Sequence, residues 1–172
     1  MPKRAPGHDT KGFSGHRNYC FACGKDNPDG MHLKFLLDDD GQHFVCRFRL
    51  PERFWGPPKH AHGGIIATVL DEAMGKVNKL HHVVAVTSKM TVEYVKPVPL
   101  GKPLMAVGWE KSVRGRRHVN VAEIRDPTGE VLARSQGTFI AVDPERMFAK
   151  YLSKAQRTAL LKPAGSARNG KR

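Results

Sequence analysis

The feature that most constrains this chain is one long apolar helix, predicted over residues 65–80 behind a pair of glycines. The preceding residues, 60–64, read His-Ala-His-Gly-Gly, and Pro57-Pro58 lies just upstream. At about 100° per residue, the apolar side chains cover half of the helix circumference. Glycines at a helix start leave backbone N–H groups uncovered, and such groups can bind an anion or polarise a carbonyl.

A second, narrower strip on the same helix is small or polar, and Asp71 is its only charge. Its members recur at steps of three or four residues: Gly64, Thr68, Asp71, Gly75 and Asn78. Such a strip lets another backbone approach closely and would bring the Asp71 carboxylate against it. The alternative is an ordinary amphipathic helix whose solvated side carries Asp71, Glu72, Lys76 and Lys79. Glu72 lies beside Lys76 and can pair with it, so Asp71 is the preferred reactive carboxylate.

Six β-rich runs flank this helix, two before it and four after it. They cover residues 31–37, 42–50, 83–95, 102–113, 117–125 and 130–142. The turn sequence at 38–41 predicts a hairpin, and those at 114–116 and 126–129 predict an antiparallel meander. A six-stranded sheet has one apolar face to bury, and one apolar helix covers it. The sequence therefore predicts an α+β domain with a six-stranded antiparallel sheet around one central helix.

The ends of the chain differ from the middle. Residues 1–18 are predicted to be a disordered lead and residues 19–143 the folded domain. Residues 144–162 are predicted to form a C-terminal helix that Pro144 can start, and residues 163–172 a basic disordered tail. No apolar run approaches the roughly 20 residues of a membrane span. No apolar segment follows the N-terminal charges either, so a cytoplasmic protein is expected.

The formal net charge of +13 would suit a nucleic-acid partner, but its distribution argues against one. Residues 144–172 carry eight Lys or Arg against one Glu, whereas residues 31–143 carry sixteen basic and twelve acidic residues. No nucleic-acid-binding motif accompanies the excess. A solvated tail is therefore preferred, and no specific nucleic-acid partner is expected.

The three cysteines do not predict a disulfide framework, because their number is odd and no export signal precedes them. Cys20 and Cys23 have the spacing of half a zinc knuckle, but no second pair follows. The residues that could complete a four-ligand site are His8, His16 and Cys46. A turn with buried thiols is preferred, and no metal is predicted. The histidines interpreted as surface residues rather than ligands are His60, His81 and His82.

Several short motifs, spread over residues 19–143, together match one protein family. They are His62-Gly63-Gly64 six residues before Asp71, then Ala73, Gly75, Thr87, Tyr94-Val95-Lys96-Pro97, Gly129-Glu130, Ala133 and Gly137-Thr138-Phe139. With these motifs the chain resembles the hot-dog fold acyl-coenzyme A (acyl-CoA) thioesterases. Within them it is similar to the phenylacetate-degradation-like and 4-hydroxybenzoyl-CoA thioesterase-like branch. The Cys-Phe-Ala-Cys-Gly motif of residues 20–24 is similar to a subset of bacterial members.

This resemblance implies a sheet wrapped around the helix, dimers or dimers of dimers, and sites at the subunit interface. It implies hydrolysis of acyl-CoA without a cofactor. The N–H of Gly63 or Gly64 would polarise the thioester carbonyl, and Asp71 of the partner's helix would act as general base or nucleophile. Thr87 matches a threonine that helps to position water, and His62 matches a residue that shapes the oxyanion site. Some relatives carry Asn or Gln six residues before this histidine, where this chain has a glycine.

The CoA part of such a substrate carries phosphates, which basic residues recognise. The candidate basic residues are Arg114, Arg116 and Arg117 in a turn, together with Lys89 or Lys96 near a strand end. Phe54 and Trp55, in the loop before the helix, are candidates for lining an acyl pocket, with capping of the core as the alternative. The sequence leaves open the acyl chain length, an aryl preference and the choice between dimer and tetramer.

Two rival functions remain open. A hot-dog module that binds acyl-CoA without catalysis fits the same fold, although it gives Asp71 no role. A nucleic-acid-binding protein would use the basic tail. A hot-dog hydratase is compatible in fold, but its usual Asp and His pairing is not evident in the helix region.

Overall fold

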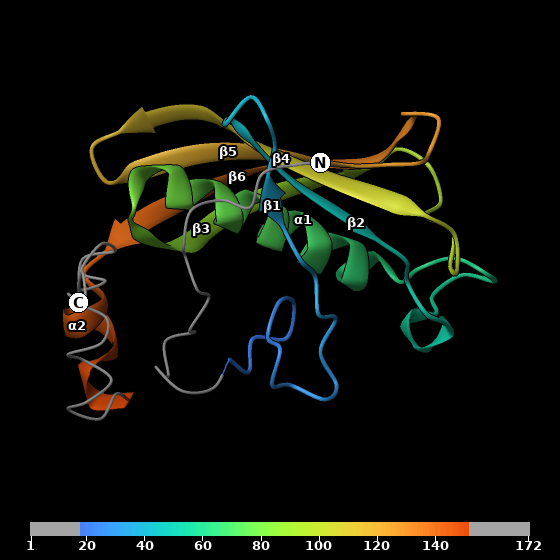
Figure 1. Cartoon of the computed structure of the whole chain (residues 1–172), viewed down its shortest axis with the longest axis horizontal. Helices are drawn as coiled ribbons and strands as arrows, with labels where there is room; N and C mark the ends of the chain where they lie inside the picture. Colours follow the sequence, from blue (N-terminus) through green and yellow to red (C-terminus); the bar gives the residue numbers. More distant parts are fainter. Residues whose placement is uncertain (1–17, 152–172) are drawn as a thin grey trace, which may run out of the picture.

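The computed structural model describes residues 18–151, in which helix α1 lies across one face of a six-stranded sheet (Figure 1). The strands are β1 (Leu36–Leu37), β2 (His43–Phe48), β3 (Val84–Tyr94), β4 (Leu104–Arg114), β5 (Arg117–Arg125) and β6 (Val131–Val142). The helices are η1 (Glu52–Phe54), α1 (Gly63–Val77), η2 (Asn78–His81), α2 (Pro144–Phe148) and η3 (Ala149–Tyr151). The predicted α+β architecture, a hot-dog fold with one central helix and a small C-terminal helix, is therefore confirmed.

The strands follow the order β1-β2-β4-β5-β6-β3, and every neighbouring pair is antiparallel. The predicted hairpin (β1–β2) and the predicted meander (β4–β5–β6) are both present. Strand β3 follows α1 in the chain and pairs with β6, so it forms one edge of the sheet. A bulge shifts the register of β3 between Thr87 and Lys89.

Small residues in the middle of the sheet allow α1 to lie close to it. A Cβ on Gly108 would lie 2.5 Å from the carbonyl oxygen of Ala73, and one on Gly137 would lie 3.0 Å from Cε of Met74. The face that α1 buries against these positions comprises Ile66, Val69, Leu70, Ala73, Met74 and Val77. The helix is thus fixed on the sheet, and its start and its flanks have defined positions.

The first strand is shorter than the predicted run over residues 31–37. The N–H of Met31 donates to the carbonyl of Phe21, and that of Leu33 donates to the carbonyl of Ala22. These residues therefore bond to the preceding Cys-Phe-Ala-Cys-Gly loop, and only Leu36 and Leu37 pair with β2.

The two ends of the chain are described only in part. The predicted disordered lead falls almost entirely outside the described residues, and the predicted basic tail does so completely. Of the C-terminal helix predicted over 144–162, the described residues are α2 and the turn η3 that follows it. No helix within residues 18–151 has the length and apolar character needed to cross a membrane.

Candidate active site

The start of α1 is capped by the side chain of His62. Nδ1 of His62 accepts from the N–H of Gly64 at 3.0 Å, and the carbonyl of His62 accepts from the N–H groups of Ile65 and Ile66. The remaining N–H of the first turn belongs to Gly63, and no acceptor for it lies within residues 18–151. Of the two N–H groups predicted as carbonyl donors, the one on Gly63 is therefore available, whereas that on Gly64 is already used.

A tight loop delivers His62 to this position. Trp55 and Ala61 form an isolated antiparallel bridge, and the N–H of His62 donates to the carbonyl of Phe54. Gly56 lies inside the loop, and a Cβ there would be 2.6 Å from Cα of His62. Glycine is the residue that fits this contact without a shift of the His62 backbone.

Tyr94 provides a contact to the helix start that sequence reasoning did not assign. Its hydroxyl, at the end of β3, donates to the carbonyl of Gly63 at 3.1 Å. The ring is about half exposed. The only sequence signal was its place in the Tyr-Val-Lys-Pro motif, because the contact joins residues 31 positions apart.

Asp71 lies in the middle of α1, half-buried, and points toward β3. The hydroxyl of Thr87 donates to Oδ1 of Asp71 at 2.8 Å. Thr87 borders the β3 bulge, and bulges commonly re-aim a side chain at a functional site. The structure thus brings together two of the predicted catalytic residues at the edge strand of the sheet.

The pKa of Asp71 is raised above the usual value of an aspartate. Burial is the main cause, and the neighbouring Glu72 adds to it, whereas the Thr87 hydrogen bond acts in the opposite direction. Burial disfavours the ionised form because water no longer solvates the charge. A carboxylate of this kind accepts a proton more readily than an exposed aspartate does.

Gly63 and Asp71 of one chain cannot act on the same carbonyl. They are eight residues apart on α1, which corresponds to about 12 Å at 1.5 Å per residue. Asp71 and Thr87 lie at the β3 edge, where unpaired backbone groups can join a second chain. Within one chain, the two residues therefore lie at separate places along α1.

The cysteine motif forms a turn beside the opposite flank of α1. Its two thiols differ in burial, with Cys20 exposed and Cys23 half-buried, whereas the third cysteine, Cys46 on β2, is buried. Burial, with the nearby Glu72 carboxylate, raises the pKa of Cys23 to about 12, so it is a thiol at neutral pH. The preferred interpretation, a turn with buried thiols, therefore needs correcting for Cys20.

The predicted substrate-binding residues lie in different places. Trp55 is exposed, but Phe54 is only 8% exposed and belongs to the core, which fits the core-capping alternative for Phe54 rather than the pocket-lining one. Lys89 is exposed beside the β3 bulge. The three arginines are exposed at the β4–β5 hairpin, at the end of the molecule where α1 finishes rather than where it starts (Figure 1).

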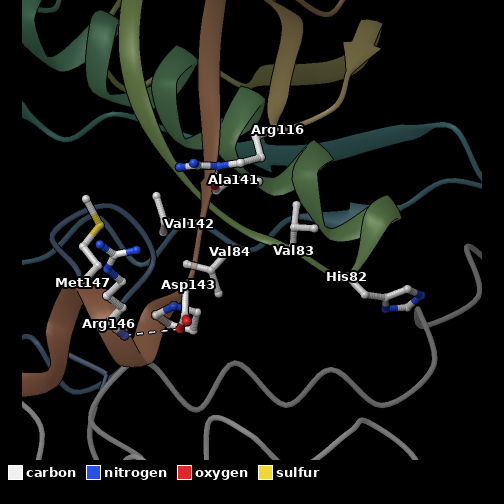
Figure 2. A pocket seen from close by; sticks show the side chains of 10 residues that line it. His82, Val83, Val84, Arg116, Ala141, Val142, Asp143, Arg146 and Met147 are labelled. Atoms are coloured by element: carbon white, nitrogen blue, oxygen red, sulfur yellow. Dashed lines mark hydrogen bonds between the residues drawn. The ribbon is translucent and has the colours of Figure 1, made fainter.

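One of these arginines, Arg116, borders a separate hollow of about 940 Å³. It lies among the start of β3, the end of β6 and α2, and Figure 2 shows apolar side chains such as Val84 and Met147 around it. Asp143 in its wall accepts a hydrogen bond from the N–H of Arg146. None of the predicted catalytic residues lines this hollow, so we place the candidate active site at Asp71 instead.

Comparison with known proteins points to one family. The family model named Thioesterase superfamily matches residues 58–133, which include Gly63, Asp71 and Thr87. The acyl-coenzyme A thioesterase THEM4 of Xenopus laevis is 29% identical over 119 residues, covering 67% of this chain and 54% of that protein. The chain thus spans about half the length of the curated relatives it matches.

Two solved structures extend this likeness. A Bacillus halodurans protein crystallised with CoA is 30% identical, with a TM-score of 0.59, and the match covers 66% of this chain and 76% of that one. A second crystal structure is of a thioesterase superfamily protein whose sequence is 28% identical to this chain. Its TM-score is 0.67, and the match covers 72% of this chain and 60% of that one.

Proposed function

We propose that the chain belongs to the thioesterase superfamily, whose family model matches residues 58–133, and that it hydrolyses acyl-CoA thioesters to the free acid and CoA. The observation that carries the proposal is the half-buried Asp71, held by Thr87 at the sheet edge. The name of the Xenopus laevis relative and the CoA in the Bacillus halodurans structure support this substrate class.

In the proposed reaction Asp71 acts as general base or as nucleophile. As a base, it takes a proton from water while the water oxygen bonds to the thioester carbon. The carbonyl oxygen becomes an oxyanion, the C–S bond then breaks, and the sulfur leaves as CoA thiol after protonation. As a nucleophile, the carboxylate itself attacks that carbon and releases CoA, and water hydrolyses the resulting anhydride.

The N–H of Gly63 is the proposed donor to the oxyanion. It is the first-turn N–H that lacks an acceptor within residues 18–151, and the His62 cap and the Tyr94 hydroxyl hold the backbone around it. Removing one such donor typically costs about 10²-fold to 10³-fold in rate. His62 is therefore proposed as a positioning residue, because its ring bonds to the neighbouring N–H.

The proposed active form is a homo-oligomer, with each site built from Gly63 of one chain and Asp71 of another. The separation of about 12 Å along α1 supports this arrangement, and β3 is the edge at which a second chain would join. The cytoplasmic location expected from the sequence and the absence of a specific nucleic-acid partner stay predictions.

Basic residues are proposed to hold the phosphates of CoA. The candidates remain Lys89, Arg114, Arg116 and Arg117, all exposed. Replacing the three arginines by glutamine should raise KM for acyl-CoA and change kcat little, because the contacts are remote from the reacting carbonyl. An unchanged KM would show that the β4–β5 hairpin does not contact the substrate. Trp55 is retained as a candidate acyl contact, with Phe54 behind it in the core.

The decisive experiment measures free thiol released from a panel of short, long and aryl acyl-CoA thioesters. We expect turnover of at least one class, and loss of turnover with retained acyl-CoA binding in Asp71→Ala. Binding without thiol release across the whole panel would instead support the non-catalytic module. Turnover that persists in Asp71→Ala would refute the assignment of Asp71.

A further inference from the structure

Three side chains from three separate elements converge where α1 ends. They are His81 of η2, Glu110 of β4 and His118 of β5. Each offers one nitrogen or oxygen atom, and these atoms all lie within 4.8 Å of one another. Nε2 of His81 hydrogen-bonds to Oε2 of Glu110. The rings of His81 and His118 meet edge to face, with their centroids 5.1 Å apart.

His118 supplies the observation that points to a ligand. Its side chain faces the interior and the residue is only 3% exposed. Its Nδ1 is enclosed by protein, and no hydrogen-bond partner for it lies within residues 18–151. A buried polar atom without a partner costs about 1–3 kcal/mol, and native proteins usually provide a partner for such an atom.

The backbone around this cluster favours convergence. A bulge between Glu110 and Ser112 shifts the register, so that Glu110 lies opposite Asn120 and Val113 lies opposite His118. Residue 82, directly after η2, has a φ of 54°, which turns the chain sharply after His81. These two irregular positions bring a β4 side chain and the end of the helix region to the same point beside β5.

We propose that His81, Glu110 and His118 bind a divalent transition-metal ion of the zinc type. Two imidazole nitrogens and one carboxylate form a set that Zn²⁺ accepts, with water in the fourth position. Bonds of about 2.0–2.1 Å place tetrahedral ligand atoms about 3.3 Å apart. The side chains of His81 and Glu110 are 39% and 31% exposed, so they are free to adjust and to leave the fourth position to solvent.

Burial, together with the nearby His81, lowers the pKa of His118, whereas Glu110 acts in the opposite direction. Histidine binds metals through its neutral imidazole. No lysine or arginine within residues 18–151 forms an ion pair with Glu110. A bound cation would therefore meet an acceptor-rich cluster.

The other two clusters of ligand-type side chains are less suited. In the cluster of Cys20, Cys23 and Glu72, the Lys76 ammonium already lies 3.1 Å from Sγ of Cys23 and 2.6 Å from Glu72. The cluster of Asp38, Asp40 and His43 lies on the surface, and Nδ1 of His43 already lies 2.7 Å from Oδ2 of Asp40. Neither contains a buried polar atom that lacks a partner.

The test uses the full-length, tag-free protein after chelator treatment. Co²⁺ is titrated and followed by visible absorption, and Zn²⁺ affinity is then measured by competition. We expect one tight site per chain, ligand-field bands without thiolate charge-transfer absorption, and no displacement by excess Mg²⁺. His81→Ala, at an exposed position, and Glu110→Gln, at a partly buried one, should each weaken binding at least tenfold.

Matched controls separate this site from the others. His43→Ala, and Cys20→Ser with Cys23→Ser, should leave the affinity unchanged. Zn²⁺ should also raise the thermal midpoint of the native protein but not that of His81→Ala, because the ion would tie η2 to β4 and β5. Absence of Co²⁺ binding, undiminished binding in His81→Ala, or loss of binding in the cysteine variant would each overturn the proposal. None of these readouts depends on thioester hydrolysis.

Discussion

Two consecutive carboxylates on α1, Asp71 and Glu72, lie on opposite flanks of the helix in different surroundings. Asp71 faces the edge strand β3, where its only hydrogen bond in the described chain is to the hydroxyl of Thr87. Glu72 faces the cysteine-containing turn, where Lys76 pairs with it at 2.6 Å. The side chains of Lys76 and Glu72 are only 12% and 16% exposed.

The difference between the flanks lies in how the charge is compensated. Burial lowers the pKa of Lys76, but the combined effect of Glu72 and Cys23 outweighs burial and raises this pKa above its ordinary value. On the Glu72 flank, the two opposite charges therefore compensate each other. No cation within residues 18–151 pairs with Asp71, and its pKa is raised by burial. A buried carboxylate without a cation destabilises the fold but gains basicity, which is why we assign chemistry to Asp71 and structure to Glu72.

The largest expected effect is on turnover. Asp71→Asn should lower kcat for acyl-CoA by about 10³-fold, within the range for loss of a general base, whereas Glu72→Gln should stay within a few-fold of the native value. Thiol release at saturating substrate measures both. Equal losses of kcat in the two variants would contradict the assignment of catalysis to Asp71 and of structure to Glu72.

Stability should respond in the opposite sense. Glu72→Gln leaves the Lys76 ammonium largely buried without its partner, so we expect the free energy of unfolding to fall by about 2–3 kcal/mol. Urea unfolding measures it, and Glu72→Gln combined with Lys76→Met should recover part of the loss. Additive losses in this double-mutant cycle would show that the pair is not coupled.

The Thr87 hydrogen bond can be tested through pH. It stabilises the ionised Asp71, so Thr87→Val should raise the pKa of Asp71 further and move the acid limb of kcat/KM to higher pH. We expect a loss of about tenfold in kcat/KM, since a hydrogen bond to a charged group is worth about 1.5–3 kcal/mol and water replaces part of it. Thr87→Ser should retain the native profile. An acid limb that does not move in Thr87→Val would contradict this role.

The smallest expected effect is a gain in stability. Because the folded state raises the pKa of Asp71, ionised Asp71 destabilises the protein at neutral pH, and Asp71→Asn should raise the thermal midpoint by roughly 2 °C. The gain should shrink as the pH falls through the raised pKa, and vanish below the ordinary aspartate pKa of about 3.9. Calorimetry at several pH values would detect it. A variant less stable than the native protein at neutral pH would show that the carboxylate is compensated after all.

Sequence reasoning located the elements well where a strong period existed. The boundaries of the alternating strands and of the apolar stripe of α1 were predicted to within a few residues. The pairing of Glu72 with Lys76 was also predicted, because these two residues lie one helical turn apart. The first strand was predicted too long, because its N–H groups bond to a loop that periodicity does not describe.

Contacts between segments that are distant in the chain could not be predicted from the sequence. The hydrogen bond of Thr87 to Asp71 was not predicted, because the resemblance implied for Thr87 only a role in positioning water. The choice between the N–H groups of Gly63 and Gly64 depends on where the His62 ring points. His81 was predicted to lie on the surface, and it does, but nothing in the sequence places His118 beside it. Such arrangements are set by strand register and helix placement rather than by local pattern.

Gly56 shows how a residue without functional groups can control reactivity. Its missing methyl group creates the space that the backbone of His62 occupies. In this chain, a larger residue would require a shift of the backbone of His62, whose ring caps α1. Variation at this position would therefore behave like damage to the reaction centre, although the altered atom would never touch a substrate.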